Sequence, residues 1–414
     1  MAEPIPLARP VLGEAEEQAV LEVLRSGHLS LGPRLAEFEQ RFAARVGASH
    51  ACAVSSGTAG LHLALRAVGV GEGDEVVTSP FSFVASANAA LYERARPVFA
   101  DIDPLTLNLD PAAAAAAVSE RTRALLPVHI FGYPADMPAF ERIAAERGLS
   151  IVEDACEALG AMHADGTAVG GRGHPAVFGF YANKQLTTGE GGMVTLADDA
   201  LKERIDSERN QGRAPDMGWL DHDRLGFNYR LSDIACALGI AQLARLDHML
   251  AQRARVAALY RDALAPLVGD GLTLPCPDGV PRPRGGLGDR RGTPPRPDGA
   301  PGRTAGTAYS QGGVGDRRGW FVFVVQLPHG VDRDDTVRAL AGVGIQSKPY
   351  LPAIHLMSFY RERFGHRPGE FPVCEDVAAR SLALPFFPAM REGQVARVAD
   401  ELSAVLAPRR AAVH

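Results

Sequence analysis

Short apolar runs recur through residues 50–155 at nearly regular spacing, and this rhythm constrains the fold more than any other feature of the chain. The runs begin 24, 22, 27 and 26 residues apart and occupy residues 51–54, 75–78, 97–100, 124–128 and 150–153. Helix-like stretches such as 59–68 and 82–91 lie between them. Strands that alternate with helices at this spacing are typical of βαβ units. The sequence therefore predicts an α/β fold with a large, doubly wound and mostly parallel sheet.

The rest of the chain predicts a second, smaller domain. Two further strands are expected at 176–181 and 193–196, and the apolar spacing over 35–46 indicates an amphipathic helix. A long helix from Ser232 to about Pro266, with Ser232 as its N-cap, is expected to link the two domains. Beyond it, a strand at 321–327 and a helix at 392–406 indicate an α+β unit. We expect a large domain over 1–250 and a smaller C-terminal α+β domain over 251–414.

Residues 277–319 have a composition that differs from the rest of the chain. Proline (7), glycine (12) and arginine (8) make up 27 of these 43 residues. The segment also repeats itself, because GGLGDRRG at 285–292 recurs as GGVGDRRG at 312–319. So little apolar surface cannot offset the entropy lost on ordering the chain. We expect a flexible surface insertion, and the alternative is a basic arm for an acidic partner.

Charge and cysteine content limit the classes of partner and compartment. The chain of 414 residues has a net charge of −6, opposite in sign to a typical nucleic-acid or anionic-membrane binder. Its five cysteines form no CxxC pair, their number is odd, and no cluster has metal-ligand spacing. No run approaches the ~20 apolar residues of a membrane span, and the first ten residues do not resemble a signal peptide. We expect a cytoplasmic protein with no metal, membrane or nucleic-acid partner.

Lysine is rare in this chain, and one lysine stands in an unusual place. Only Lys184, Lys202 and Lys348 occur among 43 basic residues, so arginine supplies the other 40 positive charges. Lys184 follows an aromatic strand in the segment FGFYANKQLTTGEGG at 178–192. An amine can form an imine with an aldehyde, whereas a guanidinium is effectively never deprotonated. Lys184 is therefore a candidate for covalent chemistry.

Two other clusters are expected at the same edge of the sheet, beyond the carboxyl ends of the strands. The segment 55–58, Ser-Ser-Gly-Thr, opens a helix, where free N–H groups and the helix dipole suit a phosphate; an ordinary helix cap is the alternative. Glu153 and Asp154 end the fifth strand, where a structural ion pair is the alternative. Amine, phosphate cradle and carboxylate together suit pyridoxal phosphate, since a carboxylate keeps the pyridine nitrogen protonated and the ring acts as an electron sink.

Seven segments in order resemble the DegT/DnrJ/EryC1/StrS family. They read SSGTAGLHLAL, TSPFSFVASANA, PVFADIDP, PVHIFGYPADM, VEDACEALGA, FGFYANKQLTTGEGG and GFNYRLSDIACALGIAQLARLD. The resemblance covers about residues 5–275 and 319–408. It implies a fold-type I aminotransferase that depends on pyridoxal 5'-phosphate. Most members act on keto-sugars attached to nucleotides.

The resemblance assigns roles to particular residues. Lys184 matches the Schiff-base lysine, and Asp154 matches the partner of the pyridinium nitrogen. Ser56, Gly57 and Thr58 match the phosphate loop.

Three further matches complete the implied cofactor site. Phe83 matches the aromatic residue that stacks on the ring, and Glu157 matches a position, often glutamine, that contacts the ring oxygen. Asn228 matches an asparagine that reaches the phosphate from the neighbouring subunit, which implies a homodimer with shared active sites.

The chain departs from the family pattern at three places. Gly179 stands where many members carry a phosphate-binding serine, so one hydroxyl donor is missing. Glu157 replaces the commoner glutamine, and a carboxylate there interacts less favourably with a phenolate-like oxygen unless it is protonated or water-bridged. The insertion at 277–319 is foreign to the pattern.

Three residues are candidates for the substrate side of the site. His129 ends the fourth predicted strand, and a hydrogen-bonded structural role is the alternative for it. Lys348 and His355 lie where the smaller domain is expected to meet the substrate.

The resemblance implies an aminotransferase that makes an amino sugar on a nucleotide carrier, with glutamate as the amino donor. An aminotransferase acting on a cyclitol or another ketone is the first alternative. A pyridoxal-phosphate-binding regulatory protein with little turnover is the second, and the presence of Lys184 argues against it.

Overall fold

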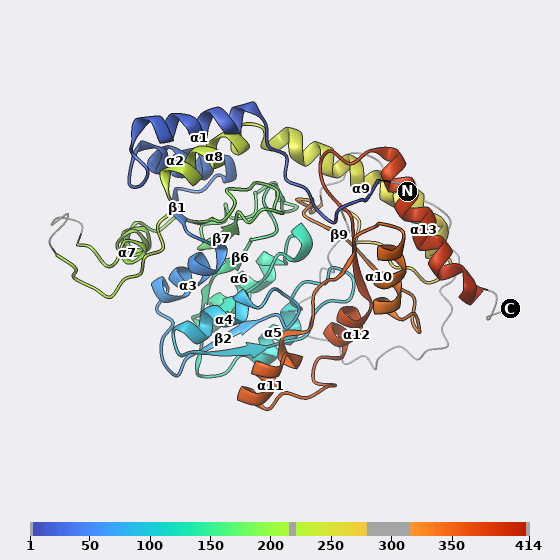
Figure 1. Ribbon diagram of the computed structural model, residues 1–414. Coiled ribbons are helices and arrows are strands. Elements are labelled where there is room, and N and C mark those ends of the chain that lie inside the picture. The colour runs from blue at the N-terminus through green and yellow to red at the C-terminus, as the bar shows by residue number, and fades with distance from the viewer. Residues whose placement is uncertain (1–2, 215–220, 280–314, 411–414) are drawn as a thin grey trace.

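One twisted sheet forms the centre of the larger domain in the computed structural model, which describes residues 3–214, 221–279 and 315–410 (Figure 1). Its strands are β1 (His50–Val54), β2 (Glu75–Thr78), β3 (Arg96–Phe99), β4 (Thr122–Leu126), β5 (Ser150–Ile151), β6 (Glu153–Asp154), β7 (Ala176–Gly179) and β8 (Gly192–Leu196). They pair in the orders β3-β2-β4-β5 and β1-β8-β7-β6. The two groups meet because β5 and β6 form one run interrupted at Val152, and Val128 pairs with Asp154.

The predicted mostly parallel α/β sheet is confirmed. Every pair among β2–β7 is parallel, and β8 runs antiparallel to both β1 and β7. The predicted strand at 150–153 is broken into β5 and β6, and its second half carries the carboxylates at 153 and 154. Carboxyl ends of parallel strands gather at one edge, where such folds place their ligands.

Helices cover the sheet on both faces (Figure 1). They are α1 (Glu14–Ser26), α2 (Pro33–Val46), α3 (Gly57–Ala67), α4 (Ala85–Tyr92), α5 (Pro111–Ala117), α6 (Met137–Arg147), α7 (Asp199–Arg209) and α8 (Asp233–Ala244). Five of them begin after an N-cap whose side-chain oxygen accepts a backbone N–H, namely Ser56, Asp110, Asp136, Asp198 and Ser232. Such caps satisfy amides that the helix itself leaves unpaired, which explains why the helices begin there.

The apolar face of α2 fixes the strand that leads to Lys184. The Phe42 ring lies 5.1 Å from the Phe178 ring, and the Phe38 ring lies 5.6 Å from the Phe180 ring. All four side chains are buried. This aromatic packing holds β7 and the loop behind it in place.

The single long helix predicted for 232–266 is two helices. Helix α8 ends at Ala244, and α9 (Leu246–Val268) continues at an angle of 62° after a break at Arg245. Ser232 caps the first of them, as expected. The first turns of α9 pack in the larger domain, through Leu246 and Met249, and later turns pack in the smaller one.

The smaller domain is an antiparallel three-stranded sheet with helices. It contains β9 (Phe323–Gln326), α10 (Arg333–Gly342), β10 (Lys348–Pro349), α11 (Ser358–Phe364), α12 (Pro372–Arg380), β11 (Ser381–Leu384) and α13 (Glu392–Arg410), with strand order β10-β11-β9. Helices α9 and α13 lie side by side in Figure 1. Ile5 also belongs here, because it pairs with Ile345 and packs in this core. The residues around Ile5 therefore pack with the smaller domain, although the prediction had included them in the unit 1–250.

The predicted insertion is narrower than 277–319. Residues 280–314 lie outside the described residues, but both flanks are ordered and paired. Gly279 donates its N–H to the Asp316 carbonyl at 2.9 Å, and Arg317 pairs with Met162. Asp316 and Arg318 are buried. The flexibility predicted for residues 315–319 is wrong, because these residues pack against the larger domain.

In the described residues, no single helix is long and apolar enough to cross a membrane. Helices α8 and α9 reach that length and apolarity only together, as a bent pair. Within the same residues, no three His, Cys, Asp or Glu side chains gather as a metal site requires.

Candidate active site

Lys184 lies in the loop between β7 and β8, with its side chain mostly enclosed. Its Nζ lies 3.5 Å from Glu157 Oε1 and 4.0 Å from the centre of the Phe321 ring. The loop is anchored by two hydrogen bonds to the Phe180 carbonyl, from the Thr188 N–H and the Thr187 hydroxyl. The amine therefore has a defined position between a carboxyl group and an aromatic face.

Asp154 is held as a hydrogen-bond acceptor. Its Oδ2 accepts from the Ser86 hydroxyl at 2.6 Å, and its Oδ1 accepts from the Cys156 N–H at 3.2 Å. The Ser86 hydroxyl also lies 2.7 Å from that of Ser82. These two donors fix the orientation of the carboxyl group that the resemblance assigns to the ring nitrogen. Sequence reasoning missed Ser86, although a serine next to a predicted aromatic contact was a signal.

The start of α3 offers unpaired amides to an anion. Ser56 Oγ accepts the Ala59 N–H at 3.1 Å and so satisfies one of the four free donors of the first turn. Among the described residues no acceptor faces the amides of Gly57 and Thr58. A Cβ at position 57 would lie 2.7 Å from Cys156 Sγ, so only glycine allows this close approach. Unpaired amides at a helix start are typical of anion sites, and the role of Ser56, Gly57 and Thr58 as a phosphate loop stays a prediction.

Cys156 lies between the three predicted clusters. Its N–H bonds to Asp154, its sulfur packs against Gly57, and Glu157 beside it contacts Lys184. Burial raises the pKa of the Cys156 thiol well above its usual value, and Asp154 adds to that rise. The carboxylate, the helix start and the amine therefore surround one thiol that stays protonated.

The two departures in the cofactor contacts have structural consequences. At Gly179 a Cβ would meet Cys156 Cβ and Sγ at 3.5 Å, an ordinary contact, so the missing serine is not excluded by crowding. Glu157 is 7% exposed, its Oε2 accepts the Phe131 N–H at 3.0 Å, and burial raises its pKa despite the opposing charge of Lys184. That rise favours the protonated carboxyl that the departure calls for.

The turn that binds Glu157 has an unusual backbone. Phe131 has φ 53° and Gly132 has φ 82°, and a Cβ at Gly132 would collide with the Gly319 carbonyl. The Gly319 N–H donates to the Gly132 carbonyl at 2.9 Å. The end of the predicted insertion therefore closes over this turn.

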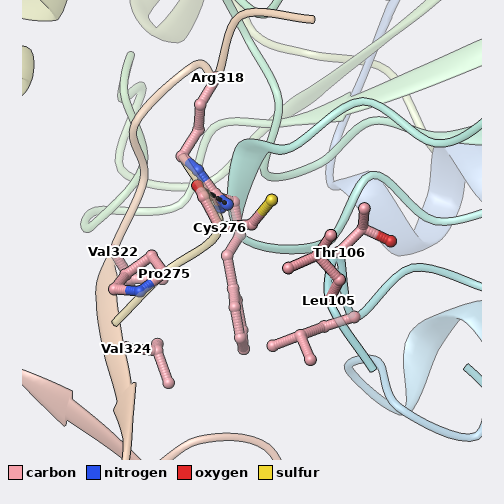
Figure 2. A pocket seen from close by; sticks show the side chains of 9 residues that line it. Leu105, Thr106, Pro275, Cys276, Arg318, Val322 and Val324 are labelled. Atoms are coloured by element: carbon pink, nitrogen blue, oxygen red, sulfur yellow. Dashed lines mark hydrogen bonds between the residues drawn. The ribbon is translucent and has the colours of Figure 1, made fainter. Parts of the chain in front are cut away.

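A small cavity lies behind the same turn (Figure 2). Its volume is about 10 Å³, room for about one water molecule, and Figure 2 labels its lining residues Leu105, Thr106, Pro275, Cys276, Arg318, Val322 and Val324. Arg318 donates to the carbonyl oxygens of Phe131 and Cys276 at 3.0 and 3.3 Å. Burial lowers the pKa of Arg318 to about 10. This cavity is too small for a substrate, and the residues that line it pack against the turn.

His129 does not lie on the substrate side, which corrects that prediction. The side chain is fully buried, its Nδ1 accepts the Ala135 N–H at 2.9 Å, and its Nε2 faces Glu153 Oε2 at 2.9 Å. An Nδ1 that accepts leaves the proton on Nε2, which then donates to the carboxylate. The structural alternative for His129 is the one that the geometry supports.

His355 is also away from any substrate surface. It is fully buried, and its Nε2 lies 3.1 Å from Glu375 Oε1 beside the Phe371 ring. Lys348 is exposed on β10, so it remains accessible, and in the described part of the chain no hydrogen bond or ion pair joins it to the residues around Lys184. The prediction for His355 is wrong, and that for Lys348 stays a prediction.

The remaining cofactor candidates are accessible. Phe83 is 62% exposed in the loop before α4, three residues before Ser86. Asn228 is exposed, and the neighbouring Tyr229 carbonyl accepts the Ser55 N–H at 2.7 Å. The segment that carries Asn228 therefore runs beside the phosphate loop of its own chain, and a role across an interface stays a prediction.

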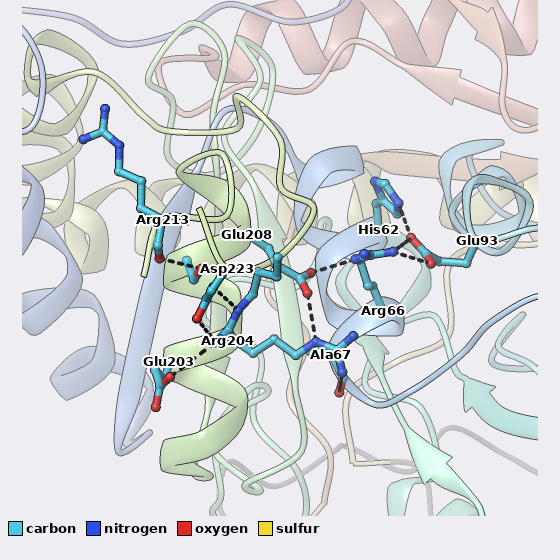
Figure 3. Close-up of polar contacts among 11 residues, drawn as sticks. His62, Arg66, Ala67, Glu93, Glu203, Arg204, Glu208, Arg213 and Asp223 are labelled. Carbon is cyan, nitrogen blue, oxygen red and sulfur yellow. Dashed lines mark hydrogen bonds and ion pairs between the residues drawn. The ribbon is translucent and has the colours of Figure 1, made fainter. Parts of the chain in front are cut away.

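A polar network supports both α3 and this segment (Figure 3). His62 on α3 lies 2.6 Å from Glu93 and 3.2 Å from the Tyr229 hydroxyl. Arg66 bonds to Glu93 and to Glu208 on α7, both at 2.9 Å. The pKa of Glu93 is lowered by its bonds to His62 and Arg66, although burial opposes this. The network ties the helix that would hold a phosphate to the chain near Asn228.

Comparison with known proteins identifies the family. The model of the DegT/DnrJ/EryC1/StrS aminotransferase family matches residues 10–277 and 304–403. The chain belongs to this family. The predicted resemblance, the fold-type I architecture and the assignment as a transaminase are thereby confirmed.

Individual relatives agree with this membership. The chain is 34% identical over 404 residues to the spore coat polysaccharide biosynthesis protein SpsC of Bacillus subtilis (strain 168), covering 94% of each. It superimposes with a TM-score of 0.82 and 32% identity on DesV of S. venezuelae, solved in complex with a ketimine intermediate, covering 98% and 99% of the two chains. Against 3-amino-5-hydroxybenzoic acid synthase the TM-score is 0.83 at 29% identity, covering 99% and 100%.

Proposed function

We propose that this aminotransferase uses pyridoxal 5'-phosphate to move an amino group from an amino acid, glutamate, to a nucleotide-linked keto-sugar. One observation carries the proposal: Cys156 bonds to Asp154 and packs against the start of α3, and the adjacent Glu157 contacts the Lys184 amine, so the three predicted clusters meet in one site. These are the three groups that the cofactor needs. Bound there, it supplies an electron sink that stabilises negative charge at the donor's α-carbon.

The residues present fit the cofactor. The unpaired amides of Gly57 and Thr58 would bind the phosphate, and the glycine leaves room for close approach. Asp154, already held by Ser86 and Cys156, would face the ring nitrogen. Lys184 would form the covalent attachment through Nζ.

The chain's own groups account for the proton transfer. In its uncharged form Lys184 Nζ takes a proton, which in the first half-reaction comes from the α-carbon of the amino donor. Glu157 lies close enough to that nitrogen to receive or return a proton, and its raised pKa makes the neutral carboxyl accessible. The Phe321 ring on the other side excludes water from the amine.

The sugar substrate is supported by the name of one relative, and amino-group transfer to a ketone is supported by the description of another. SpsC is described as a polysaccharide biosynthesis protein and is 34% identical over 94% of this chain. DesV was solved with a ketimine intermediate, the kind of adduct formed in amino-group transfer to a ketone. Glutamate and the nucleotide carrier remain proposals that follow from the family resemblance.

A ketone on a carbocyclic ring is the second candidate substrate. The observation that favours it is the TM-score of 0.83 with 3-amino-5-hydroxybenzoic acid synthase at 29% identity. A panel of nucleotide-linked 3- and 4-keto-sugars, run beside cyclic ketones without a nucleotide, decides between the two. Amination confined to the ring ketones would overturn the sugar assignment.

A homodimer with shared sites belongs to the same proposal. Asn228 is exposed at the edge of its own phosphate loop, where a partner chain could receive it. Mixed dimers of Lys184→Ala and Asn228→Asp chains test this, since a two-fold interface gives one site both defects and the other neither. Activity should return towards half per dimer. If confirmed mixed dimers recover nothing while both parents are impaired, each site lies within one chain.

We also propose a cytoplasmic location. All five cysteines are unpaired, and four of them are buried. Unpaired thiols are typical of reducing compartments. Fractionation of the native host tests this directly.

The attachment point is tested with Lys184→Ala. Borohydride treatment of the wild type with pyridoxal phosphate should leave the cofactor mass on the peptide that contains residue 184. The same peptide of Lys184→Ala should carry no added mass. Lys202→Ala is the control, because Lys202 is paired with Asp206 on α7. Turnover by Lys184→Ala at the wild-type rate would show the assignment to be wrong.

A further inference from the structure

The Lys184 amine has a neighbour that the cofactor chemistry leaves unexplained. Its Nζ lies 4.0 Å from the centre of the Phe321 ring, within the range of a cation–π contact. Phe321 is 1% exposed and comes from the smaller domain, just after the residues that close over the Phe131 turn. The contact therefore joins the two domains at the reactive nitrogen.

One arginine holds both partners of this contact. Arg253 on α9 donates from Nη1 to the Phe321 carbonyl at 2.9 Å and from Nη2 to the Lys184 carbonyl at 3.2 Å. The guanidinium thus links the backbone of Lys184 to the backbone of Phe321.

The burial of Arg253 makes this bridge unfavourable in desolvation free energy. The residue is 4% exposed, and among the described residues it has no carboxylate partner; its guanidinium lies over the Phe386 ring at 5.7 Å. Burial alone lowers the pKa of Arg253 to about 10. A buried charge without a counterion is costly, so an apolar side chain would be expected here if packing were its only task.

Other titratable groups lie near the amine in the larger domain. Glu157 is in contact with it, Asp154 lies at the end of β6 three residues before Glu157, and Cys156 lies between them in the chain. Tyr350 from the smaller domain interacts with Glu157, and burial raises the pKa of its hydroxyl. The Lys184 amine therefore has the apolar Phe321 ring as one neighbour and the carboxyl groups of Glu157 and Asp154 as its polar neighbours.

We propose that the Phe321 ring is the resting platform of the free Lys184 ammonium, and that Arg253 is the positioning residue that keeps ring and lysine together. The inference rests on the proposed role of Lys184 as the attachment point, because that lysine is free only between the covalent stages of turnover. In this arrangement the released amine stays within reach of the reacting atoms instead of moving into solvent.

The scarcity of lysine makes a direct test possible. Reductive methylation with ¹³C formaldehyde labels three lysines and the N-terminus, and the Lys184 signal is identified by its loss in Lys184→Arg. In the full-length protein without cofactor, an amine over a ring face gives a signal displaced upfield by the ring current. Lys202 and Lys348 serve as internal references.

Replacing Phe321 with leucine removes the ring face but keeps the site apolar. We expect Phe321→Leu to lose the upfield displacement of the Lys184 signal, because leucine has no ring current and no ring face to hold the ammonium. The matched control is Phe323→Leu, which removes an equally buried ring that stacks on Tyr260 and Trp320 instead. Equal effects of the two variants, or no displacement in the wild type, would overturn the platform.

The role of Arg253 is read from the same signal. Arg253→Met should abolish the displacement, and Arg253→Lys, which keeps the charge but reaches one carbonyl, should restore part of it. If Arg253→Met does not fold, the partial displacement in Arg253→Lys still tests the role. Variants that lower the unfolding midpoint without moving the signal would show a purely structural role and overturn the assignment.

Failure of the proposed function gives a different result. If pyridoxal phosphate added to the unlabelled wild type does not protect Lys184 from later methylation, the attachment point is wrong whatever the ring current shows. If protection occurs but the apoprotein signal is not displaced, the attachment stands and the platform fails.

Discussion

Replacing Glu157 with glutamine tests the electrostatics of the site most directly. Glutamine keeps the shape and can still accept the Phe131 N–H, but it cannot ionise. In the wild type, burial raises the pKa of Glu157 above its ordinary value of 4.5, although the Lys184 charge opposes the rise. The ionised carboxylate is therefore disfavoured in the folded chain relative to the unfolded one.

The sign of the effect follows from that rise. A carboxyl whose pKa is raised by folding contributes stability below its unfolded pKa, and this contribution is lost as the pH rises through the folded pKa. Each unit of rise corresponds to about 1.4 kcal/mol. The stability of Glu157→Gln relative to wild type should therefore increase with pH by about 1.4 kcal/mol for each unit of that rise.

Urea unfolding of the cofactor-free protein at several values between about pH 5 and pH 8 measures this difference. Loss of the contact with Lys184 lowers the stability of the variant by a roughly constant amount, so the slope with pH carries the information. Glu141→Gln is the control, because its bond to Arg172 lowers the pKa of Glu141, so Glu141 stays ionised in both states over this range and its difference from wild type should not change with pH. A difference between Glu157→Gln and wild type that does not change with pH would refute the reasoning.

Three further predictions concern the supports of the site. Asp154→Asn should keep pyridoxal phosphate bound but lose most transamination in a coupled assay, because an amide cannot hold a ring nitrogen protonated; undiminished turnover would contradict this role. Ser86→Ala removes a 2.6 Å bond to that carboxylate and should weaken cofactor binding about tenfold by fluorescence titration, since bonds to charged groups are worth about 1.5–3 kcal/mol; an unchanged Kd would count against it. Deleting 281–314 should change the unfolding midpoint little, whereas Asp316→Ala should lower the free energy of unfolding by about 1–3 kcal/mol, because the buried carboxylate accepts the Ala164 N–H at 3.0 Å. A larger destabilisation by the deletion than by Asp316→Ala would contradict this prediction.

The sequence predicted the strands of the sheet well because their pattern is recorded locally. Apolar runs of strand length at βαβ spacing appear as strands within two residues of their predicted bounds. The motif around Lys184 and the serine before α3 also carry their meaning within a few residues. Ser56 is indeed an N-cap, as its place before a helical pattern indicated.

The histidines show where local reasoning failed. His129 and His355 follow strands or loops in the right part of the chain, yet both are fully buried and bonded to glutamates. Their partners Glu153 and Glu375 lie 24 and 20 residues away. A polar side chain looks the same in a sequence whether it faces substrate or a buried carboxylate, so only the fold separates the two roles.

The sequence by itself determined the α/β class and the family, because periodicity and contiguous motifs specify backbone structure and local chemistry. The tertiary structure alone decided what surrounds the amine of Lys184, the predicted attachment point. Arg253 and Phe321 lie 69 and 137 residues beyond Lys184, and Arg318 closes the Phe131 turn from 187 residues away. Contacts over such separations depend on how two domains pack, and no local pattern of residues records that packing.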